Sequence, residues 1–85
     1  MMITLRFFAS VRESLGTSSE TIDLPPGVDT VGALRDHLVQ RGGAWEQALA
    51  EGRALRMACN QVMAQPSTAI ADGCEVAFFP PVTGG

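Results

Sequence analysis

Hydrophobic residues alternate with polar ones at the start of the chain. Over residues 2–9, Ile3, Leu5 and Phe7 fall on one side of an extended backbone, and this two-residue period is that of a β-strand with one buried face. The same alternation predicts further strands within residues 20–24, 53–60 and 71–79. The side chains that these strands turn inward are predicted to be Ile22, Leu24, Leu55, Met57, Cys59, Val76 and Phe78.

A longer hydrophobic period in residues 28–43 predicts a helix. Its apolar positions recur every three or four residues, at Val31, Leu34, Leu38 and Val39. Asp29 or Thr30 can accept hydrogen bonds from the first turn, and the glycine pair at residues 42 and 43 is a common C-terminal stop. This segment is the main helix of the predicted fold.

Two shorter segments complete the predicted elements. Residues 10–19 predict a helical turn or loop that stops at Gly16, and residues 44–52 predict a short helix that ends at Gly52. Their inward side chains are predicted to be Val11, Leu15, Trp45 and Leu49. Pro66 lacks a backbone N–H, so it limits any strand near it to the edge of a sheet.

Two strands, a helix and then further strands make the order of an α+β domain. We predict a mixed sheet with one main helix packed on one face, while the other face meets water. The first two strands are expected to pair antiparallel through a long loop, and the first and last strands to lie side by side in parallel. The folded domain is assigned to residues 1–79, followed by a flexible tail at 80–85.

Composition places the chain among folded proteins. Of its 85 residues, 46% are hydrophobic and 18% are charged, so a single domain can bury a core. Neither a basic leader nor a long apolar stretch is evident, so a cytoplasmic location without membrane contact is expected. The net charge of −3 argues against a nucleic-acid partner and favours a basic protein surface.

The chain offers few groups for catalysis or metal binding. Cys59 and Cys74 lack the spacing and the additional ligands of a metal site, so they are interpreted as small core residues and no metal is expected. His37 has no nucleophile at a recognisable spacing and is interpreted as a surface residue of the helix. All six basic residues are arginines, which either reflects composition or keeps side-chain amines away from an activated carboxylate.

Phe8 and Phe79 break the strand pattern. Parity places Phe8 with Thr4 and Arg6, and Phe79 with Glu75, on the face that should meet water. One exposed aromatic residue is ordinary. Two at the C-terminal ends of adjacent strands would form an apolar patch at the root of the tail, which predicts a protein-binding surface.

The last eight residues read FFPPVTGG. The two prolines hold the backbone extended, and the two glycines, having no Cβ, can pass through a narrow channel. Six extended residues reach about 20 Å. The tail could therefore carry a terminal carboxylate into a pocket of another protein.

Three stretches together resemble a known family: LRFFASVRESLGT near the start, TVGALRDHL in the predicted helix and EVAFFPPVTGG at the end. They closely resemble the small, sulfur-carrying subunits of molybdopterin synthases. That family has a ubiquitin-like β-grasp fold, and the resemblance covers essentially the whole chain in the same order.

The resemblance implies a sulfur carrier in molybdenum cofactor biosynthesis that is not an enzyme on its own. In the family, an E1-like activating enzyme uses ATP to adenylate the C-terminal carboxylate, and a persulfide donor supplies the sulfur. The resulting thiocarboxylate attacks cyclic pyranopterin monophosphate in the large subunit, within a heterotetramer. The small subunit itself is expected to bind no cofactor, since ATP binds to the activating partner.

Matching positions give the expected site. Gly85 would bear the acyl-adenylate and then the sulfur. The segment that threads into the partner would be Pro80, Pro81, Val82, Thr83 and Gly84. Phe8, Phe79 and Met63 match positions that contact the large subunit and the activating enzyme, and Met63 stands where the family has a leucine.

Two alternatives share the terminal glycines. A β-grasp sulfur carrier of the thiazole-biosynthesis type has the Gly-Gly end but typically lacks the preceding Phe-Phe-Pro-Pro. A ubiquitin-like modifier would join its tail to lysines of target proteins, and a plain interaction module would do no chemistry with it.

Overall fold

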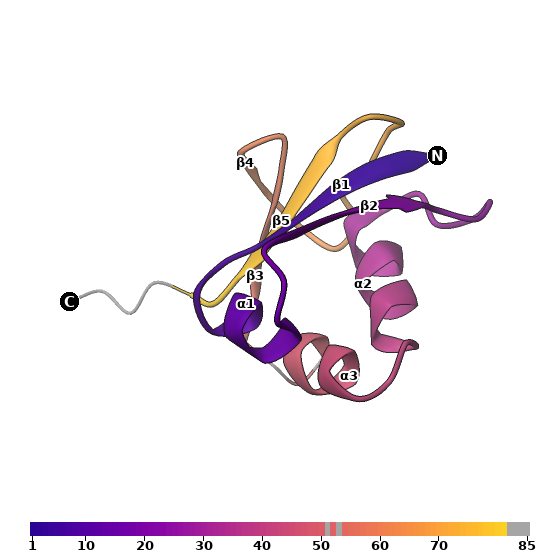
Figure 1. The fold of residues 1–85 in the computed structure, drawn as a ribbon. Helices are drawn as coiled ribbons and strands as arrows, with labels where there is room; N and C mark the ends of the chain where they lie inside the picture. The colour runs from indigo at the N-terminus through magenta and orange to yellow at the C-terminus, as the bar shows by residue number, and fades with distance from the viewer. Residues whose placement is uncertain (51, 53, 82–85) are drawn as a thin grey trace.

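The computed structural model describes residues 1–50, 52 and 54–81. Within them, a five-stranded mixed sheet has the strand order β2-β1-β5-β3-β4. Strands β1 and β5 run parallel at its centre, and the other neighbouring pairs run antiparallel (Figure 1). The strands are β1 (Met2–Phe7), β2 (Ser19–Asp23), β3 (Arg56–Cys59), β4 (Val62–Ala64) and β5 (Glu75–Phe79). The predicted parallel pairing of the first and last strands is confirmed.

In the described part of the chain, three helices lie on one face of this sheet (Figure 1). They are α1 (Ala9–Leu15), α2 (Val31–Val39) and α3 (Ala44–Leu49). The α+β prediction is confirmed, with α2 as the longest helix and α1 and α3 adding to the cover. At nine residues α2 is far shorter than a membrane span, and no other helix among the described residues is long and apolar enough to be one.

Helix α2 begins at a side-chain cap and ends earlier than predicted. The Thr30 hydroxyl accepts a hydrogen bond from the backbone N–H of Ala33 at 3.1 Å, so Thr30, and not Asp29, is the cap. The helix ends at Val39. Gly42, with a φ of 75°, lies in the short turn that leads into α3.

Helix α3 also ends before the predicted stop, at Leu49 and not at Gly52. Ala50, with a φ of −54° and a ψ of 149°, leaves the helical conformation. The Nε of Arg35 in α2 donates to the carbonyl oxygen of Leu49 at 2.6 Å, and its Nη2 donates to that of Ala50 at 2.5 Å. The final carbonyls of a helix need partners from outside its own ladder. Here a neighbouring helix supplies them.

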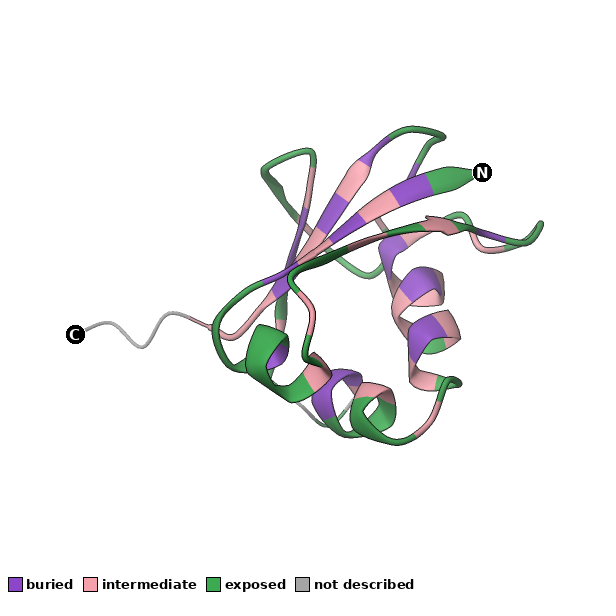
Figure 2. Ribbon diagram, viewed as in Figure 1, coloured by how far each residue is buried: buried purple, intermediate pink, exposed green. Residues whose placement is uncertain are grey.

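The hydrophobic core fills the space between the sheet and the helices (Figure 2). The central strands contribute side chains that are at most 1% exposed, namely Ile3, Leu5, Phe7, Val76 and Phe78. Other predicted inward residues, among them Ile22, Leu55 and Cys59, are partly buried against this core. The assignment of inward faces from strand parity is therefore confirmed.

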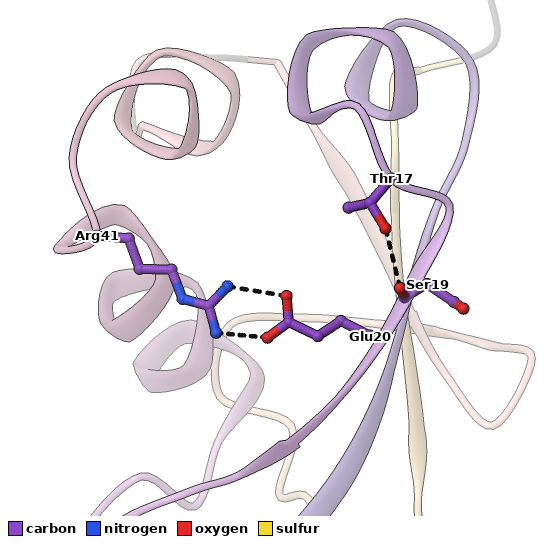
Figure 3. A network of polar contacts seen from close by, with 4 residues as sticks. All are labelled: Thr17, Ser19, Glu20 and Arg41. Carbon is purple, nitrogen blue, oxygen red and sulfur yellow. Dashed lines mark hydrogen bonds and ion pairs between the residues drawn. The ribbon is translucent and has the colours of Figure 1, made fainter.

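The edge strand β2 is tied to the helical layer by a chain of side-chain contacts. Arg41, which follows α2, donates to both carboxylate oxygens of Glu20 in β2, at 3.0 and 2.6 Å (Figure 3). The Arg41 guanidinium also lies 4.4 Å from the ring centroid of Trp45. The Trp45 ring in turn contacts the buried ring of Phe7 edge-on, with centroids 5.5 Å apart.

Candidate functional site

The sheet face opposite the helices carries the predicted partner residues. Arg6 pairs with Ala77, Ala77 with Ala58, and Ala58 with Met63. Residues paired in this way on adjacent strands point to the same face. These four side chains therefore form one row across β1, β5, β3 and β4, on what we call the outer face.

A second row lies nearer to the tail. Phe79 pairs directly with Arg56, and the Phe8 N–H donates to the carbonyl oxygen of Phe78 at 3.2 Å, which extends the contact between β1 and β5 by one residue. Phe8 is thus a neighbour of Phe79. The prediction of a strand over residues 2–9 is wrong at its end, because β1 ends at Phe7 and Phe8 is the N-cap of α1.

The backbone after Phe8 turns abruptly. Ala9 has a φ of 52°, in the left-handed region that is costly for a residue with a Cβ. The Phe8 carbonyl oxygen accepts hydrogen bonds from the N–H groups of Val11 and Arg12 at 3.2 and 3.3 Å, which start the helix at once. The chain leaves the sheet at this point, and the Phe8 side chain remains 44% exposed.

The residues predicted to contact a partner lie around the small apolar side chain of Ala58. Met63 is 61% exposed and Phe79 is partly buried, whereas Ala58 is only 8% exposed although it faces away from the helices. Ala58 lies between its cross-strand partners Met63 and Ala77, and its burial shows that the outer face does not simply meet water as predicted. We refer to the five apolar residues of the two rows as the tail-root patch: Phe8, Ala58, Met63, Ala77 and Phe79.

Two arginines stand among these apolar residues. The Arg6 guanidinium lies 5.8 Å from the ring centroid of Phe8, and its Nη1 is 3.6 Å from Oε2 of Glu75. The Nε of Arg6 is buried and has no hydrogen-bond partner among the described residues. Arg56 is exposed directly beside Phe79. Strand parity could have revealed both, since it places them on the face of the two phenylalanines.

The surface has one hollow at the root of the tail and another that includes the patch residue Met63 in its lining. A cavity of about 280 Å³ at the root of the tail is lined by Ser10, Val11, Ser14, Ala48, Ala54, Leu55 and Pro80. A second, of about 330 Å³, borders β3 and β4 and includes Arg56, Met63, Gln65 and Pro66 in its lining. Both are open to solvent, and the lining of the second also includes Arg35, so two arginines border it.

The tail leaves the sheet from its central region. Strand β5 is hydrogen-bonded on both sides, to β1 and β3, up to its last residues. Pro80 and Pro81 follow it directly and are partly buried. The predicted site residues Val82, Thr83, Gly84 and Gly85 lie outside the described residues, so their roles remain predictions.

The cysteines and the histidine do not form a second site. Cys74 is 6% exposed and Cys59 is partly buried. Burial, together with the neighbouring Cys74 thiol, raises the pKa of Cys59 above its ordinary value and so favours the unreactive thiol. His37 is partly buried within α2. The described residues contain no group of three or more His, Cys, Asp or Glu side chains that could hold a metal ion.

Comparisons with known proteins match nearly the whole chain. The model of the ThiS family matches residues 5–85. A relative from Haemophilus influenzae is 43% identical over 84 residues, which cover 99% of this chain and 100% of the relative. One from Escherichia coli is 45% identical over 86 residues, with the same two coverages. Both relatives bear the name molybdopterin synthase sulfur carrier subunit.

Solved structures share the fold. The small archaeal modifier protein SAMP1 from Haloferax volcanii superimposes with a TM-score of 0.80, at 31% identity and with 100% of each chain covered. A chain from the complex of subunits 1 and 2 of the molybdopterin-converting factor of Helicobacter pylori gives a TM-score of 0.68, at 24% identity and again with full coverage of both chains. The β-grasp architecture predicted from the sequence is confirmed.

Proposed function

Because the chain belongs to the ThiS family, we propose that it is the sulfur carrier of a molybdopterin synthase. The observation that carries this proposal is the full-length identity of 43% and 45% to two proteins with that name. The fold adds a physical basis, since a rigid central strand ends beside an exposed apolar patch and continues into the Pro80-Pro81 pair.

The proposed chemistry takes place at the Gly85 carboxylate. This carboxylate attacks the α-phosphate of ATP on an E1-like activating enzyme, and pyrophosphate leaves. The terminal sulfur of a persulfide donor then attacks the acyl carbon, AMP leaves, and a thiol cleaves the remaining S–S bond to release a thiocarboxylate. The thiocarboxylate sulfur finally attacks a carbon of cyclic pyranopterin monophosphate. Water then hydrolyses the bond between this sulfur and the Gly85 acyl carbon, which leaves the sulfur on the pterin and restores a carboxylate that can be charged again.

The folded domain would bind the partner, and the tail would carry the reactive C-terminal group. Phe8, Met63 and Phe79 would dock on the large subunit of the synthase, in keeping with the named two-subunit complex of the Helicobacter pylori neighbour. Docking would direct the segment from Pro80 onward into the partner's active site. In this scheme the domain contributes by positioning the tail, and it supplies no catalytic side chain.

Intact-mass analysis tests this proposal. The purified chain would be incubated with ATP, the activating enzyme and a persulfide donor, and the expected product has one oxygen replaced by sulfur at Gly85. Reactions without ATP, and a variant lacking Gly85, should keep their original masses. An unchanged mass under conditions that charge the Escherichia coli relative would contradict the proposal.

Mass analysis and a pull-down together separate the alternative functions. The 31% identity to SAMP1 is the reason to test for a modifier function. Products in which the chain is joined to lysines of other proteins would favour this function. A thiazole-type carrier would gain sulfur as well, but it would not bind the large subunit of molybdopterin synthase. Recovery of that subunit in a pull-down therefore decides between the two sulfur pathways.

A further inference from the structure

The charge of the docking surface differs from that of the chain as a whole. The chain has a net charge of −3, which by itself favours a basic partner. On the outer face, however, the two rows nearest the tail contain Arg6 and Arg56, and the acidic residues lie in the rows beyond them. Those residues are Glu75, which pairs with Thr4, and Asp23, which pairs with Met2 at the far end of β1.

Among the described residues, neither arginine has a carboxylate at hydrogen-bond distance, although Arg6 forms a long ion pair with Glu75. Arg6 is 3.6 Å from Glu75 at its nearest pair of atoms, which is long for a charge-assisted hydrogen bond, and its Nε is unpaired. No described acidic side chain forms an ion pair with Arg56, which is exposed. Arg41, by contrast, is held by both oxygens of Glu20.

Covering the tail-root patch would remove water from these two guanidiniums. Arg56 is the cross-strand partner of Phe79, and Arg6 that of Ala77. A partner that buries Phe79 or Ala77 must therefore contact the arginine stems and crowd their charged ends. Burying a charge is unfavourable unless an opposite charge or a hydrogen-bond acceptor meets it.

We infer that the large subunit presents an apolar projection to the tail-root patch, flanked by two carboxylates that meet Arg6 and Arg56. The two arginines lie on β1 and β3, on either side of β5, and Arg56 is offset by one row toward the tail. Their backbones are therefore roughly 12 Å apart at the usual strand spacing and rise per residue. The partner's carboxylates should show a similar separation across the apolar contact. This inference rests on the proposed function, because it takes the large subunit as the occupant of the patch.

Salt dependence and matched charge changes test the inference. Binding of the full-length chain to the purified large subunit would be measured by calorimetry over a series of sodium chloride concentrations. Arg56→Gln is the decisive variant, because Arg56 is exposed and its loss leaves the core intact. Ala44→Glu, at an exposed position on the helical side, makes the same change of one charge unit away from the patch.

The expected result is a roughly three- to tenfold weaker binding of Arg56→Gln at low salt, with the difference shrinking as salt rises. Arg6→Gln should behave similarly, and Arg56→Glu should weaken binding further. Ala44→Glu should stay within about twofold of the unchanged chain.

Equal affinities of Arg56→Gln and Ala44→Glu, or a wild-type affinity that does not change with salt, would overturn the inference while leaving the proposed function standing. Failure of the wild-type chain to bind the large subunit at any salt concentration would instead reject the proposed function, and this inference with it. Where binding is weakened, a double-mutant cycle with Asp→Asn and Glu→Gln variants of the large subunit would identify the two carboxylates.

Discussion

Arg41 forms a bidentate ion pair with Glu20: its Nη1 and Nη2 donate to the two carboxylate oxygens at 3.0 and 2.6 Å. The two side chains are each 31% exposed, so the pair is only partly shielded from water. It joins strand β2 to the segment between α2 and α3, across a separation of 21 residues in the chain. The contact of Arg41 with Trp45 links this pair to the core.

The contribution of this pair to the free energy of unfolding should decrease in acid. The hydrogen bond from Arg41 lowers the pKa of Glu20 below its ordinary value, with burial opposing it and the charge of Arg41 assisting. The folded-state pKa is thus below the unfolded one, so the stabilisation is present above the unfolded value and is lost as pH falls through the folded value.

Glu20→Gln should lower the free energy of unfolding near neutral pH by about 0.5 to 1 kcal/mol, because a partly exposed pair is screened by solvent. The deficit should shrink in acid, where Glu20 of the unchanged chain is protonated too. Urea unfolding near neutral pH and near pH 3 would measure this. A deficit that stays constant between the two would contradict the assignment.

The adjacent residues Phe78 and Phe79 should respond in opposite ways. Phe78 is 0% exposed and stacks on Phe7, so Phe78→Ala should cost about 3 to 5 kcal/mol of stability. Phe79→Arg, and likewise Phe8→Arg, should leave the fold intact and abolish binding to the large subunit. Thermal unfolding and pull-down of the same variants measure both effects; folded Phe79→Arg that still binds would refute the docking role.

Close packing against Pro66 is predicted to make a side chain at Gly32 unfavourable. Gly32 lies in α2 with an ordinary helical φ, but a Cβ at this position would lie 2.9 Å from the carbonyl oxygen of Pro66. The same oxygen accepts the Gly32 N–H at 2.8 Å. Although alanine favours a helix by about 1 kcal/mol over glycine, Gly32→Ala should destabilise the protein by about 1 to 3 kcal/mol through this clash.

Urea unfolding of Gly32→Ala measures this balance. Ala33→Gly, one position further along the same helix, should lose only the propensity term of about 1 kcal/mol. A Gly32→Ala variant as stable as the unchanged chain would show that the segment around Pro66 can move aside.

The internal cysteines should be dispensable for sulfur transfer. The raised pKa of Cys59 predicts slower alkylation by iodoacetamide in the folded chain than in the urea-unfolded chain, and Cys74 should be protected by burial. A variant with Cys59→Ala and Cys74→Ala should still gain sulfur at Gly85 in the intact-mass experiment. Loss of charging in a folded double variant would place a thiol of this chain in the pathway.

Local patterns in the sequence determined the elements and their buried faces. Alternation put Ile3, Leu5 and Phe7 inside and Phe8 outside, and the capping residues at 29 and 30 marked the start of α2, because these properties depend on residues a few positions apart. The family motifs likewise made the β-grasp fold and the sulfur-carrier hypothesis readable without coordinates.

The tertiary structure decided what depends on residues distant in the chain. At the end of α3, Arg35 of another helix donates hydrogen bonds to the carbonyl oxygens of Leu49 and Ala50. Ala58 is buried on the outer face, between its cross-strand partners Met63 and Ala77. Cross-strand register places Arg56 beside Phe79 at the root of the tail. Such relationships arise only when chain folding brings separate segments together, since no local spacing encodes which strands become neighbours.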